Sequence, residues 1–136
     1  MSKKTKTGKV IDIEIQVNPV KYIGRRLSFY KSKLIVEQIG QSEMYSAIQK
    51  VICICITSYE LFPKEKDYIN NFMFYNPKNG LLFADIPEEI YTLELPKVPA
   101  SNDGSGLWDW LQFLKSKSKE EFEMVAERNP EIRKAA

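Results

Sequence analysis

A row of acid and amide side chains stands out in the stretch GKVIDIEIQV, residues 8–17. Apolar and polar residues alternate there as in a β-strand, so Asp12, Glu14 and Gln16 should point to one face. Successive side chains on one face lie about 6.6 Å apart, which lets their ends approach one small site. A carboxylate in such a row can ligate Mg²⁺, and a neighbouring polar group can hold water in line with a phosphate. The solvated face of an edge strand has the same pattern, and alternation does not separate the two.

The chain contains no histidine, which narrows the chemistry open to it. Ser-His-Asp and Cys-His nucleophiles, His-ligated zinc and a His general base are excluded. Any catalysis must use carboxylates, Lys, Tyr, Cys or a metal ion. The two cysteines, Cys53 and Cys55, are expected to be buried and structural, because free cysteine is among the most buried residue types.

The 136 residues suit a single domain. No apolar run reaches the roughly 20 residues that span a bilayer, and we expect a cytoplasmic protein. The net charge of +2 is unevenly distributed, because residues 1–50 hold ten Lys or Arg against four Asp or Glu. A basic half is suited to a polyanion such as DNA, although a solvated Lys-rich surface would have the same composition.

The order of predicted elements indicates a mixed α/β domain. After the strand, Asn18 and Pro19 precede a helix from about Lys21 to Gln38, with Gly40 beyond its end. Its apolar stripe is Ile23, Leu27, Tyr30 and Leu34.

Further strands and helices are predicted downstream. VICICIT should form a strand covered on both faces, NPKNG a hairpin turn, and EEIYTLELP another strand. Helices are predicted around residues 107–114 and 119–128. The hairpin aromatic residues Phe72, Phe74, Tyr75 and Phe83 are expected in the core, with an interface between chains as the alternative.

Several of these segments, in this order, resemble one protein family. They are IDIEIQV, RRLSFYKSKLIVEQIGQSEMYSAIQKVICICI, ELFP, LELPK and the tail LWDWLQFL…EEFEMVAERNPEIRKA. The resemblance is to Rpn-type recombination-promoting nucleases, also described as PD-(D/E)xK nuclease family transposases. It implies a restriction-endonuclease-like mixed α/β sheet flanked by helices, with an added β-hairpin and C-terminal helices. Residues 1–99 would form the nuclease-like domain without its first elements, and residues 100–136 a helical extension packed on it.

The resemblance also implies a site. Glu14-x-Gln16 occupies the place of the family's (D/E)-x-K element, so Glu14 would ligate Mg²⁺ or Mn²⁺ and Gln16 would orient water or a phosphate oxygen. Arg26 and Tyr30 fall where the family carries an Arg and a Tyr facing the site, and with Lys33 they would bind DNA. A surface ion pair for Arg26 and a core position for Tyr30 are the alternatives.

One departure from the family's pattern concerns its earlier acidic ligand, since no Asp or Glu precedes Asp12. Asp12 could substitute as a metal ligand if its side chain bends toward Glu14. We therefore expect a metal-dependent DNA endonuclease that is weak or inactive. An inactive DNA-binding or protein-interaction remnant is the alternative. A shortened amino end would leave an open edge beside the Glu14 strand, which predicts a homo-oligomer.

Overall fold

The computed structural model describes residues 2–4, 8–39 and 44–99 of the chain. In chain order the strands and the α-helix are β1 (Ser2–Lys4), β2 (Val10–Gln16), α1 (Ile23–Val36), β3 (Val51–Thr57), β4 (Ile69–Phe72) and β5 (Glu88–Glu94). Two short 3-10 helices, η1 (Tyr45–Ala47) and η2 (Leu95–Lys97), precede β3 and follow β5. The predicted carboxyl-terminal helices, and the proposed extension over residues 100–136, lie outside the described residues.

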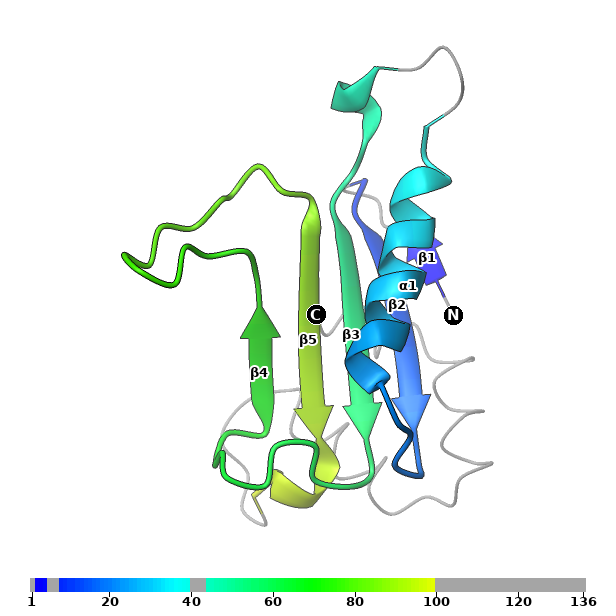
Figure 1. Ribbon diagram of the computed structural model, residues 1–136. Coiled ribbons are helices and arrows are strands. Elements are labelled where there is room, and N and C mark those ends of the chain that lie inside the picture. The colour runs from blue at the N-terminus through cyan, green and yellow to red at the C-terminus, as the bar shows by residue number, and fades with distance from the viewer. Residues whose placement is uncertain (1, 5–7, 40–43, 100–136) are drawn as a thin grey trace.

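The five strands form one mixed sheet in the order β1-β2-β3-β5-β4. β2, β3 and β5 are parallel neighbours, and the outer strands β1 and β4 pair antiparallel with β2 and β5. In Figure 1 the helix α1 lies across β2 and β3 on one side of the sheet. The restriction-endonuclease-like α/β arrangement expected from the sequence is confirmed.

The strand register gives the two faces of the sheet different chemistry. Ile13 is paired with Ile54 in β3, which is paired with Tyr91 in β5, and such in-register neighbours point to one side. This side carries the main apolar core, which is rich in isoleucine. The alternate residues of β2, including Asp12 and Glu14, point to the other side, where Leu27 of α1 packs on the two cysteines of β3. The polar row therefore faces the helix.

The helix α1 is shorter than the sequence predicts. It begins after Tyr22, whose backbone is left-handed (φ 62°, ψ 36°), and its first turn closes with the Arg26 N–H donating to the Tyr22 carbonyl at 3.0 Å. Leu27 is buried against the sheet, as the apolar stripe predicts. The helix ends at Val36.

The predicted hairpin turn is present between β4 and β5. Gly80, with φ +74°, donates its N–H to the Asn76 carbonyl at 2.8 Å, and Tyr75 forms an antiparallel bridge with Leu82. Figure 1 shows this segment extending away from the sheet. Its aromatic side chains are consequently exposed, 45% for Phe74 and 63% for Phe83, so the expectation that they lie in the core is wrong.

The edge of the sheet at β2 is partly covered. β1 pairs with residues 10–12 only, from Lys4 opposite Val10 to Ser2 opposite Asp12. Within the described part of the chain no strand pairs with the outer edge of β2 from Ile13 to Gln16. No helix among the described residues is long and apolar enough to cross a membrane.

Candidate functional site

Two carboxyl groups of β2 interact on the helix side of the sheet. Asp12 is 3% exposed and Glu14 is half-buried. Burial raises the pKa of the Glu14 carboxyl, and the negative charge of Asp12 and a hydrogen bond with it raise that pKa further. The two carboxyl groups therefore interact directly with each other. A simple solvated strand face does not fit, because the row is largely covered.

The two cysteines of β3 lie beside this acid pair on the same face of the sheet. The Cys53 thiol donates a long hydrogen bond to Asp12 Oδ2 (Sγ–O 3.8 Å), and Cys55 is the register partner of Glu14. Both are fully buried and free of disulfides. Burial, above all, raises the pKa of both thiols, to about 12 for Cys55. Both thiols are therefore protonated near neutral pH, and Cys53 acts toward Asp12 only as a hydrogen-bond donor. The expected burial of both cysteines is confirmed.

Gln16 closes the polar row at the end of β2. Its side chain is on the same face as Glu14, and the residue is 9% exposed. Its main-chain carbonyl accepts a hydrogen bond from the Ser58 N–H at 3.1 Å, which ties the end of β2 to the segment that follows β3. The strand therefore places Gln16 on the same face as Glu14, two residues further along β2, with an amide that carries no charge.

The helix places a positive charge near the acids. The guanidinium of Arg26 opposes the rise in the pKa of Glu14, so it acts on the same carboxylate as Asp12. It also lies over the ring of Tyr30, 5.6 Å from the ring centre. Tyr30 is half-buried. Lys33 lies two turns beyond Arg26, where its ammonium is 4.0 Å from Glu37, so it is not joined to the acid pair.

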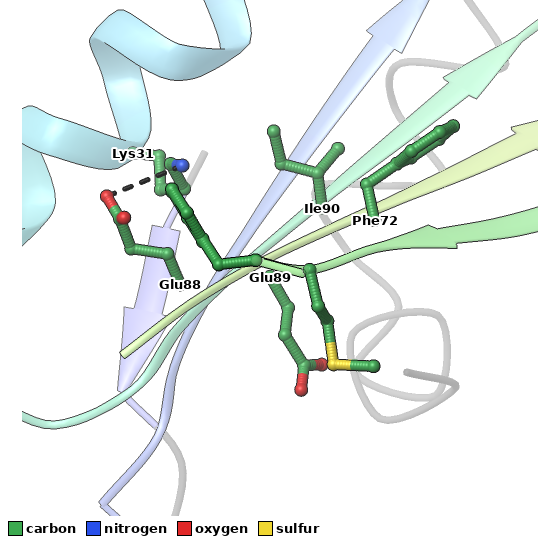
Figure 2. A pocket seen from close by; sticks show the side chains of 7 residues that line it. Lys31, Phe72, Glu88, Glu89 and Ile90 are labelled. Carbon is green, nitrogen blue, oxygen red and sulfur yellow. Dashed lines mark ion pairs between the residues drawn. The ribbon is translucent and has the colours of Figure 1, made fainter. Parts of the chain in front are cut away.

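Lys31 is a buried charge that the sequence reasoning missed. Its ammonium is 3.4 Å from Glu88 Oε1 and 5.5 Å from the centre of the Phe74 ring. Figure 2 shows this ion pair beside a cavity of about 200 Å³ near the start of β5. The cavity is lined by Lys31, Phe72, Met73, Phe74, Glu88, Glu89 and Ile90. The spacing along the helix predicts its burial, because Lys31 follows the buried Leu27 by one helical turn and so lies on the same face.

The acid pair is a compact set of oxygen donors. Among the described residues no group of three or more His, Cys, Asp or Glu side chains is arranged to hold a metal ion. Two carboxylates are still compatible with Mg²⁺, which usually takes only one or two protein ligands and completes its shell with water and phosphate. With Arg26 nearby, the site combines two carboxyl groups, a neutral amide and a cation.

Comparison with known protein families matches the whole chain, residues 1–136, to the family described as PD-(D/E)XK nuclease family transposase. The same comparisons find no matching curated protein and no matching solved structure.

Proposed function

Because this chain belongs to the PD-(D/E)XK nuclease family transposases, we propose that it is a metal-dependent DNA endonuclease with Asp12 and Glu14 as its metal ligands. The observation that supports this most directly is the contact between these two carboxyl groups on the helix side of β2. Nuclease chemistry follows from the family; the metal, the ligands and the activity of this chain are the proposal. We also propose a cytoplasmic location, where such a protein would meet DNA.

The donor set fits a hard divalent cation. Two carboxylates held together repel each other, and the raised pKa of Glu14 reflects that repulsion together with burial. A cation between them would remove the repulsion. Carboxylate oxygens suit Mg²⁺ or Mn²⁺ rather than a soft metal. When bound, the metal ion would neutralise charge on the scissile phosphate and favour ionisation of the attacking water.

The remaining groups have separate roles in this proposal. The Gln16 amide oxygen can accept a hydrogen bond from the attacking water, or its N–H can donate one to a phosphate oxygen. Either bond orients the group that Gln16 contacts. Gln16 stands at the position of the family's lysine but carries no charge, so Arg26 supplies the positive charge instead. Its guanidinium can bind a phosphate through two parallel hydrogen bonds. Tyr30, beneath Arg26, holds that guanidinium in place.

We propose that cleavage is weak, because Asp12 is mostly enclosed and accepts a hydrogen bond from Cys53. A cation bound between the two carboxyl groups would compete with the Cys53 thiol for Asp12. A DNA-binding protein without cleavage is the second candidate. The observation in its favour is that α1 carries four cationic residues, Arg25, Arg26, Lys31 and Lys33, and no acid between Ile23 and Val36.

We also propose that the protein self-associates. The outer edge of β2 from Ile13 to Gln16 has no strand partner in the described part of the chain, and such edges recruit other chains. Sedimentation velocity at micromolar protein concentration should show a dimer or larger species. A monomer throughout the accessible concentration range contradicts self-association without affecting the nuclease proposal.

The direct test is nicking of supercoiled plasmid with Mg²⁺, with Mn²⁺ and with EDTA. We expect slow cleavage that requires the metal and falls at least about 100-fold in Glu14→Gln and Asp12→Asn. Glu37→Gln removes an exposed acid at the end of α1 and should leave the rate unchanged. Metal-independent cleavage, or cleavage retained in Glu14→Gln, would reject the proposed site. DNA binding without cleavage would favour the second candidate.

A further inference from the structure

The solvent face of α1 carries aromatic and basic side chains in one stripe. Tyr22 and Phe29 are each 65% exposed, and Arg25, Arg26 and Lys33 are exposed as well. Arg26, Phe29 and Lys33 follow one another at i, i+3 and i+7, which places them with the neighbouring Arg25 on one side of α1. Tyr22 lies just before the helix, and its ring contacts Arg25. We call these five residues the α1 platform. In Figure 1 α1 lies in front of the sheet, and no described segment passes in front of the helix.

Two of the three cationic groups of the platform, those of Arg25 and Arg26, already lie against aromatic rings. The guanidinium carbon of Arg25 is 4.7 Å from the centre of the Tyr22 ring, and that of Arg26 is 5.6 Å from the centre of the Tyr30 ring. Phe29 and Tyr30 meet edge to face, with ring centres 5.7 Å apart. Flat rings and guanidinium planes are the surfaces on which unstacked bases bind.

Tyr22 occupies an unusual backbone position. Its left-handed conformation is one that glycine or asparagine adopts at much lower cost than a bulky residue. A tyrosine there stores strain while its ring remains two-thirds exposed. Burial in the core does not account for the choice of residue, because the ring lies on the surface, where it contacts Arg25.

The positive charge of α1 favours a negatively charged ligand. Three cations of the platform face solvent, and α1 contains no acid that would repel a polyanion. The platform also reaches the candidate site, because Arg26 acts electrostatically on Glu14. In a duplex the bases are stacked inside and cannot lie on side-chain rings, whereas in a single strand they can.

We propose that the α1 platform binds unpaired nucleotides of a DNA strand, with Phe29 and Tyr22 stacking on bases and Arg25, Arg26 and Lys33 contacting phosphates. This inference rests on the proposed function for the identity of the ligand as DNA. It adds a substrate class, namely single-stranded DNA or DNA with unpaired bases beside the cut.

Base stacking can be separated from charge by comparing two fluorescent strands of equal length, one of ordinary sequence without self-complementarity and one built of abasic nucleotides. Both are titrated with the full-length protein in EDTA and followed by fluorescence anisotropy. The ordinary strand should bind about tenfold more tightly than the abasic strand, because stacking on aromatic side chains favours each stacked base. It should also bind more tightly than the corresponding duplex.

The decisive variant is Phe29→Ala, compared with Phe83→Ala on the hairpin between β4 and β5. The two residues are the same type and have nearly equal exposure, 65% and 63%, so neither substitution should unfold the protein. Phe29→Ala should remove most of the preference for the ordinary strand and leave affinity for the abasic strand unchanged. Phe83→Ala should alter neither.

Equal affinity for the two strands, or an equal effect of the two variants, overturns the platform proposal. Metal-dependent cleavage alongside such a result would leave the proposed nuclease intact. Base-dependent binding that Phe29→Ala abolishes, without cleavage under any metal condition, would support the platform and reject the nuclease. Absence of binding to every DNA would reject the platform and would also contradict DNA as the substrate.

Discussion

Asp12 and Glu14, two residues apart on β2, interact through their carboxyl groups on the side of the sheet that α1 covers, and Arg26 on that helix acts on the same Glu14 carboxylate. Strands place residues i and i+2 on one face, but they do not require the ends of two acids to meet. The pairing costs stability in the absence of a cation, because both burial and like charge disfavour the ionised pair. This cost leads to two predictions about the metal-free and metal-bound protein.

The first prediction concerns stability against pH. Burial and Asp12 raise the pKa of Glu14 above its ordinary value of 4.5. The stabilisation from protonated Glu14 is therefore complete below about pH 4.5 and is lost as pH rises through the higher pKa of the folded state. Glu14→Gln should be more stable than the parent protein near neutral pH, with a flatter pH dependence. Urea unfolding from pH 4.5 upward, in EDTA, measures both effects.

The same titrations with Glu37→Gln give the control, because Glu37 is exposed at the end of α1. Its pH dependence should follow that of the parent. Parallel curves for Glu14→Gln and the parent protein would contradict the interaction between Glu14 and Asp12.

The second prediction concerns metal binding. Calorimetric titration of Mn²⁺ or Mg²⁺ into the protein should give saturable binding, and saturating metal should raise the midpoint of thermal unfolding. Asp12→Asn and Glu14→Gln should each weaken binding at least about tenfold, since each removes one of two anionic ligands. Glu37→Gln should bind as the parent does. Unchanged affinity in Asp12→Asn would mean that Asp12 is a structural partner of Cys53 and not a ligand.

Much of this fold could be predicted from sequence periodicity. The alternation in β2, the continuous apolar run of β3 and the NPKNG turn each gave the observed element, because each pattern is local. The spacing places Asp12 and Glu14 on one face, but it does not decide whether their side chains meet, since that depends on side-chain direction. The burial of Glu94 also depends on contacts that are distant in the sequence. Its Oε1 accepts hydrogen bonds from the N–H groups of Leu61 and Phe62.

Arg26 and Lys33 of the α1 platform are expected from the sequence to bind DNA, but its other members, Tyr22, Arg25 and Phe29, are not predicted, for a different reason. The helical period predicts an apolar stripe and the observed burial of Leu27, but it assigns no role to aromatic residues elsewhere on the helix. Phe29 lies off that stripe, and its exposure follows from the helical period. The left-handed backbone of Tyr22 has no sequence signal, because glycine and asparagine are the residues that mark such positions.

The third prediction tests the strain at Tyr22. Tyr22→Gly should relieve a cost of about 1–2 kcal/mol in the folded state and add about 0.4–1 kcal/mol of chain entropy to the unfolded state. The net result is a protein as stable as the parent or more stable by about 1 kcal/mol, as chemical denaturation would measure. Ser28→Gly, at an exposed position inside α1, should instead destabilise by about 0.5 kcal/mol. A clear loss of stability in Tyr22→Gly would mean that the ring makes contacts that outweigh the strain.

The fourth prediction concerns the buried ion pair of Lys31 and Glu88, whose side chains are 7% and 19% exposed. Lys31→Met keeps the apolar stem but leaves the Glu88 carboxylate mostly buried beside no cation, so it should destabilise the protein by about 2–3 kcal/mol. Lys33→Met is the matched control, because Lys33 is 62% exposed and only 4.0 Å from the exposed Glu37, and it should cost less than about 0.5 kcal/mol. The double variant Lys31→Met with Glu88→Gln should recover much of the loss, since the uncompensated charge is removed as well. If the double variant is no more stable than Lys31→Met alone, the loss comes from packing against Phe74 and not from the ion pair.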